Sequence, residues 1–162
     1  MDKNHAGMTN MKGDNYRKLL IMALLSFISM YILMYSMVNT MSDVYNSFNQ
    51  FYMAGVMTAP MVIFGLLIMR SMYPNKQLNA AILAVSVIAL IGFFFFIRQQ
   101  TAIGDKQFLR SMIPHHSGAI LMCERSSIQD PEIQALCDSI VQSQQEEIHQ
   151  MEDILQRLDS EG

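Results

Sequence analysis

The sequence has few charged residues for its length. Lys, Arg, Asp and Glu make up only 15% of the 162 residues, tryptophan is absent, and the formal net charge is −3. A nucleic-acid-binding surface requires clustered basic residues, and no such cluster occurs along the chain. Because 51% of the residues are hydrophobic, the composition differs from that of a soluble domain and predicts a protein that contacts the lipid bilayer.

Charges are absent from three long apolar segments, residues 19–38, 51–69 and 78–97. Each is about as long as the roughly 20 helical residues that cross a hydrocarbon core. We therefore expect three transmembrane helices within residues 19–97, preceded by a polar segment over residues 1–18. The first apolar segment is too long for the core of a cleaved signal peptide, so we interpret it as an anchor.

Basic residues flank these segments unevenly, and cytoplasmic loops carry the excess of Lys and Arg. This rule predicts a cytoplasmic N-terminus and a C-terminal part, residues 98–162, on the periplasmic or extracellular side. Six basic residues would then lie inside and three outside: Lys3, Lys12, Arg17, Lys18, Arg70 and Lys76 inside, and Arg98, Lys106 and Arg110 outside.

Residues 98–162 have the polar, periodic pattern of surface helices. Asp105 follows Gly104 as a helix-capping residue, and Asp130-Pro131-Glu132 combines a capping carboxylate, a first-turn proline and an acid near the helix start. The pattern predicts an antiparallel helical hairpin outside the membrane, so the expected fold class is an all-α membrane protein. Such a hairpin buries little apolar surface, and we expect a homodimer that completes a four-helix bundle.

The hairpin places several potential metal ligands in one region. Imidazole with thioether suits a soft ion such as Cu(I), and imidazole with carboxylate would also admit Cu(II) or zinc. Adjacent histidines project about 100° apart on a helix, so one of them would need a partner from elsewhere, such as a second subunit. The alternative is a polar cap over a bend at Pro114, with the methionines as ordinary core residues. The residues of this region are Met112, His115, His116, Glu147, His149 and Met151.

Two cysteines, Cys123 and Cys137, lie roughly opposite each other in the expected hairpin. They could be small core residues, a disulfide across the hairpin, or soft metal ligands. An oxidising compartment would favour the disulfide.

Three stretches of the C-terminal part carry a family resemblance: residues 108–122 with a Met-Ile-Pro-His-His core, residues 130–133, and residues 144–151 with Glu-Ile-x-x-Met. They resemble the domain-of-unknown-function 305 family (DUF305). The resemblance implies a bacterial, often exported, ferritin-like helical protein, with the copper binding described for some members. By position, it implies as ligands Met112, His115, His116, Met122 and Met151.

These features predict a membrane-anchored protein of the bacterial inner membrane that sequesters or delivers copper, or zinc, without catalysis. No nucleophile–base pair or Gly-rich phosphate loop indicates an enzyme. A structural or partner-binding membrane protein without metal is one alternative. The other is a copper permease lined by methionines of the first two spans, namely Met30, Met34, Met37, Met41, Met53, Met57 and Met61.

Overall fold

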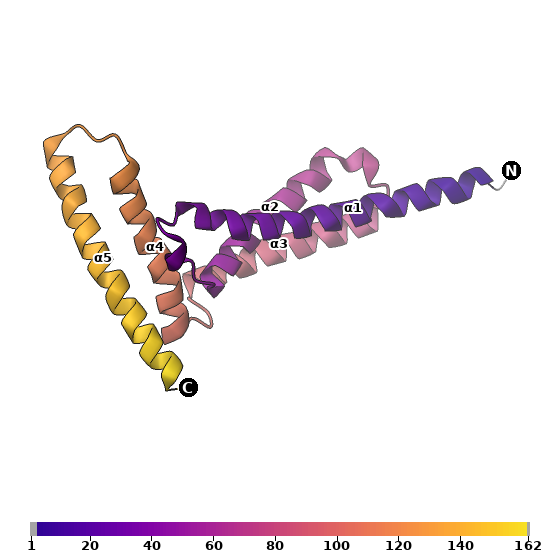
Figure 1. Ribbon diagram of the computed structural model, residues 1–162. Coiled ribbons are helices and arrows are strands. Elements are labelled where there is room, and N and C mark those ends of the chain that lie inside the picture. Colours follow the sequence, from indigo (N-terminus) through magenta and orange to yellow (C-terminus); the bar gives the residue numbers. More distant parts are fainter. Residues whose placement is uncertain (1–2, 162) are drawn as a thin grey trace. The chain divides into compact units, whose positions relative to one another are not determined.

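The computed structural model describes the backbone of residues 3–161 and the side chains of residues 14–161. Lys3 and Lys12, used in the orientation argument, therefore lie outside the described side chains. Within this range the chain is all helical, as expected (Figure 1). The α-helices are α1 (Lys3–Leu33), α2 (Phe48–Ile68), α3 (Lys76–Arg98), α4 (Asp105–Arg125) and α5 (Pro131–Ser160), with short 3₁₀ turns at Met34–Met37, Met41–Asp43 and Arg70–Met72.

Three helices are long and apolar enough to cross a membrane. They cover Asp14–Met37, Phe48–Ile68 and Lys76–Arg98, which confirms the three expected spans with ends shifted by a few residues. The third begins where the Asn75 side chain accepts a hydrogen bond from the backbone N of Leu78 at 3.0 Å.

The methionines named as the lining of a permease do not all lie on one α-helix at the end of the first span. The α-helix α1 ends at Leu33, and the chain continues as the 3₁₀ turn Met34–Met37. Met41 belongs to a separate 3₁₀ turn, Met41–Asp43. The end of the first span therefore departs from the α-helix where the chain begins to pack on α4.

The described residues form two compact units. One contains the chain up to Ile32 together with Phe51–Thr101, and the other contains Leu33–Gln50 together with the chain from Ala102 onward. The second unit is therefore larger than a hairpin over residues 98–162, because it also includes the connection between α1 and α2.

Aromatic and small residues pack the first unit. Gly55 of α2 lies so close to the Phe93 ring of α3 that a Cβ at this position would clash with a ring carbon. Phe93 also stacks near Tyr52 and Phe96, with ring centroids 6.3 and 6.4 Å away. The absence of a side chain at Gly55 thus permits close helix packing, as small residues commonly do in membrane helices.

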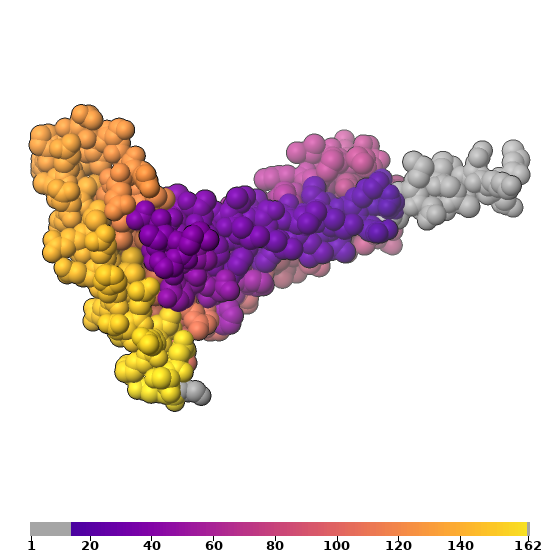
Figure 2. All heavy atoms as spheres, viewed as in Figure 1, coloured from indigo at the N-terminus to yellow at the C-terminus, as the bar shows by residue number. Residues whose placement is uncertain are grey.

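In the second unit α4 and α5 lie antiparallel (Figure 1), and the space-filling view leaves no gap between their connected ends, drawn in orange (Figure 2). Asp130 caps α5, accepting hydrogen bonds from the backbone N of Glu132 and Ile133 at 2.9 and 3.1 Å. α4 continues through Pro114, so the helix does not restart there. The core between the helices consists of Leu109, Ile113, Ile120, Ile148, Met151 and Leu155.

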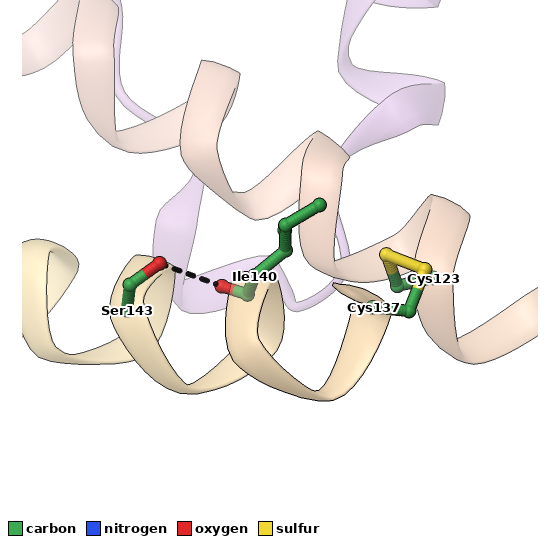
Figure 3. The surroundings of a disulfide bond; sticks show 4 residues. All are labelled: Cys123, Cys137, Ile140 and Ser143. Atoms are coloured by element: carbon green, nitrogen blue, oxygen red, sulfur yellow. Dashed lines mark hydrogen bonds between the residues drawn. A yellow bond between two sulfur atoms is a disulfide. The ribbon is translucent and has the colours of Figure 1, made fainter. Parts of the chain in front are cut away.

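Both ends of the hairpin are fastened. Near the turn, a disulfide joins Cys123 to Cys137, and the side chain of Ile140, one turn further on, points toward α4 (Figure 3). At the open end, Nζ of Lys106 lies 2.9 Å from a carboxylate oxygen of Asp159. The closed loop is short, and a bond of this span contributes about 3 kcal/mol to stability.

The contact at Gly55 yields a first prediction. Replacing Gly55 with Ala should destabilise the α2–α3 packing by about 1–3 kcal/mol, because the Phe93 ring must move. Thermal unfolding of the full chain in detergent measures this effect. Gly92→Ala is the matched control, since nothing lies within 4 Å of its position. Equal melting temperatures for the two variants would contradict the prediction.

Candidate metal site

The connection between α1 and α2 is tied to α4 through Ser117. Its hydroxyl accepts a hydrogen bond from the backbone N of Asn39 at 2.8 Å and donates one to Oδ2 of Asp43. Ser117 is fully buried and Asp43 is only 7% exposed. A buried carboxylate is costly unless it is partnered, so this arrangement holds the connection firmly in one place.

Further contacts extend this attachment along α4. The Asn39 side chain donates to Oε2 of Glu124 at 3.1 Å, and the backbone N of Phe48 donates to Oε1 of Gln107 at 3.0 Å. Gly118 allows the closest approach, because a Cβ there would lie 3.2 Å from the carbonyl oxygen of Met37. The connection consequently lies directly against α4 at Ser117 and Gly118, the residues that follow the two histidines.

A cavity of about 410 Å³ lies within this second unit. Three of its side chains carry thioether sulfur and one carries an imidazole, all of them potential ligands for a soft metal ion. It is lined by Met34, Met37, Val38, Gln50, Ser111, Pro114, His115, Gly118, Ala119 and Met122.

The two histidines occupy different surroundings. His115 is exposed and lines the cavity, whereas the His116 side chain is only 12% exposed and lies beside Glu147 of α5. Their ring centroids are 6.0 Å apart. The helical geometry that sends adjacent side chains in different directions therefore separates them.

His116 is a largely buried imidazole, and its buried Nδ1 makes no hydrogen bond. This nitrogen lies 3.0 Å from Oε2 of Glu147, within ion-pair distance, but the two groups are not aligned as a hydrogen bond. Burial lowers the pKa of His116 below its usual value, and the nearby Glu147 carboxylate opposes this effect only in part. The neutral ring is therefore favoured at neutral pH.

The remaining predicted ligands are distributed over the hairpin. Met151 belongs to the buried core between α4 and α5, and Met112 packs against that core. Met122 is 54% exposed and lines the cavity, and His149 is exposed on α5. The structure brings two of the predicted ligands to the cavity and leaves the others elsewhere: His115, expected in the hairpin region, and Met122, implied by the family resemblance.

The other common ligand types do not converge in the same way. Among residues 14–161, no three side chains of His, Cys, Asp or Glu lie together as a group that could hold a metal ion. The cysteines bond to each other and are not available as thiolates. The donor set that the described chain assembles is therefore one of thioethers and imidazole.

Several residues of this site carry little signal in the sequence. Asn39 and Asp43 lie in a short polar connection that resembles any loop between spans, and Met34 and Met37 lie in the apolar segment that predicts the first membrane helix. The one available hint is the small pair Ser117-Gly118 directly after the histidines, since such a pair permits close approach of another segment.

Comparison with known proteins agrees with this architecture. The sequence pattern of DUF305, described as a domain of unknown function, matches residues 97–155. Uncharacterized protein L153 of Acanthamoeba polyphaga mimivirus is 33% identical over 144 residues, which cover 87% of this chain and 93% of that protein. The chain belongs to the DUF305 family. The similarity to L153 is much longer than the DUF305 match, so it also covers most of the apolar half. No solved structure matches the chain.

The buried imidazole of this DUF305 protein predicts a pH dependence of stability. Because the folded state lowers the pKa of His116, the unfolded chain binds the proton more tightly. The contribution of the uncharged His116 ring to folding stability is complete above the ordinary histidine pKa of 6.5, and it declines as the pH falls below that pKa. Thermal unfolding of the full chain at about pH 7.5 and about pH 5.5 should therefore show a loss of stability that His116→Gln reduces. His149→Gln, at an exposed position, is the control and should retain the full loss.

Proposed function

We propose that this protein binds copper at the cavity of its second unit and, anchored by its three spans, sequesters or delivers the metal without catalysing a reaction. The observation that supports this proposal is the placement of His115 and Met122. Both belong to the part of the chain that matches DUF305, and both line one cavity. Imidazole and thioether together are typical ligands of copper.

The same donor set argues for copper over zinc. Structural zinc sites use thiolates, imidazoles and carboxylates in closed groups of four. In residues 14–161 no such side chains gather even in threes, and the cavity offers sulfur as thioether. Thioethers select soft ions, of which copper in its reduced form is the common biological example.

Replacing His115 tests the proposal. The full chain, purified in detergent and incubated with copper, should retain about one ion per chain after dialysis. The His115→Ala variant should retain little copper, because His115 is the one imidazole among the residues that line the cavity. Metal analysis measures the ratio. His149→Ala, exposed on α5, is the matched control and should bind as the wild type does. Undiminished copper in His115→Ala would refute a site at this cavity.

We further infer that the hairpin lies on the oxidising side of its membrane, with the N-terminus in the cytoplasm. The uneven distribution of Lys and Arg supports this orientation, and so does the disulfide between Cys123 and Cys137. The bacterial inner membrane is the location that the family resemblance implies, and it stays a prediction.

The orientation has its own test. Protein taken directly from membranes and treated with an alkylating reagent should show no mass increase at Cys123 and Cys137, because both sulfurs are bonded. Reduction before alkylation should add two labels, one for each cysteine. Two labels without reduction would place the hairpin in a reducing compartment.

The alternatives have less support. Met53 and Met57 of α2 are 41% and 43% exposed, so they do not line the interior of a single chain as a permease would require. Pairing of two hairpins stays a prediction, based on the little apolar surface that one hairpin buries, and the 48% and 58% exposed side chains of Ile133 and Leu136 are compatible with it. The copper site itself does not need a second subunit, because His115 already has a neighbouring segment from its own chain.

A further inference from the structure

The wall of the cavity opposite α4 comes from outside the DUF305 match. Met34 and Met37 form the last turn of the first apolar span, and together with Val38 and Gln50 they line the cavity that His115 and Met122 line from α4. The close contact of Gly118 with the carbonyl of Met37 fixes this turn against the helix. Two groups of soft donors from distant parts of the sequence therefore meet at one place.

The cavity carries no negative charge. None of its ten lining residues is acidic, and the lining is rich in apolar side chains. A metal ion that leaves water for such a site loses less solvation energy when it carries one charge than when it carries two. The uncharged donors of the cavity consequently favour a monovalent ion.

One polar atom at the cavity lacks a partner. Oε1 of Gln50 is buried and makes no hydrogen bond within the described part of the chain, and Gln50 lines the same cavity. Buried carbonyl oxygens normally have a partner, so an unpaired one indicates a place for a bound ion or water molecule.

We propose that Met34 and Met37 are ligands of the ion held by His115 and Met122, and that the ion is monovalent, Cu(I) or its analogue Ag(I). This inference rests on the proposed copper function and specifies its oxidation state and its sulfur ligands. Three thioethers and one imidazole form a four-ligand set of soft donors. An ion bound in this way joins the end of the first span to α4.

Competition with a chromophoric Cu(I) chelator tests the ligand assignment on the full chain in detergent. Met34→Leu/Met37→Leu should weaken Cu(I) binding by more than about 100-fold, because loss of even an outer-shell partner costs roughly 10- to 100-fold. Leucine keeps the side-chain volume and removes the sulfur. Met41→Leu is the matched control, since Met41 lies in the same connection, is 87% exposed and does not line the cavity.

The two variants distinguish the assignment of Met34 and Met37 as ligands from the proposed copper function. Unchanged Cu(I) affinity in Met34→Leu/Met37→Leu, with affinity lost in His115→Ala, would overturn the methionine assignment and leave the copper function in place. Affinity lost in the methionine variant but kept in His115→Ala would refute the histidine site and support the two methionines as ligands. A wild-type chain that binds no Cu(I) would refute both the methionine assignment and the proposed copper function.

A measurement on the wild type does not depend on how the variants fold. Peroxide oxidises exposed methionines to sulfoxides, which mass spectrometry locates. Bound Ag(I) should protect Met37 and Met122, which are 50% and 54% exposed, and should leave Met41 as reactive as before. Protection of Met122 without protection of Met37 would overturn the inference.

Discussion

The second unit depends on one buried hydroxyl. Ser117 connects the backbone of Asn39 to the carboxylate of Asp43, and both the backbone N of Asn39 and Oδ2 of Asp43 would lose this hydrogen bond if the connection moved away from α4. Leaving a buried polar group unpaired costs about 1–3 kcal/mol, and more for a charged one. This cost, and not apolar burial alone, selects a single position for the chain between α1 and α2. The cavity exists because that position is fixed, since Met34 and Met37 form one wall and α4 forms the other.

Features set by neighbouring residues could be predicted from the sequence. The three spans follow from uncharged segments of sufficient length, and the start of α5 follows from Asp130-Pro131-Glu132, whose cap has the expected hydrogen bonds. The attachment of the connection to α4 could not be predicted in this way. Its hydrogen bonds join residues 78 and 74 positions apart, and such contacts leave no periodic pattern in the sequence. The division of the second unit between two separate parts of the chain is therefore visible only in the structure.

The candidate site shows the same division between local and distant constraints. Helical geometry alone requires that His115 and His116 face different ways, and the structure has them in different surroundings, one at the cavity and one beside Glu147. The sequence could not show which element would meet His115. The divergence of the two histidines predicts a partner from elsewhere for one of them, such as a second subunit. At the cavity, the chain itself supplies a neighbouring segment, which hydropathy assigns to the first span.

Binding of the proposed ion at the cavity would reinforce the attachment of the connection to α4. The hairpin is closed by a disulfide near its turn and by Lys106–Asp159 at its open end, whereas the connection is held to α4 by non-covalent contacts. A ligand that binds only the closed arrangement stabilises it by about 2.7 kcal/mol at 100 times its dissociation constant. That is comparable to the cost of unpairing one buried polar group. An ion held from both walls would therefore strengthen the part of the second unit that has no covalent fastening, and release of the ion would return that part to its hydrogen bonds alone.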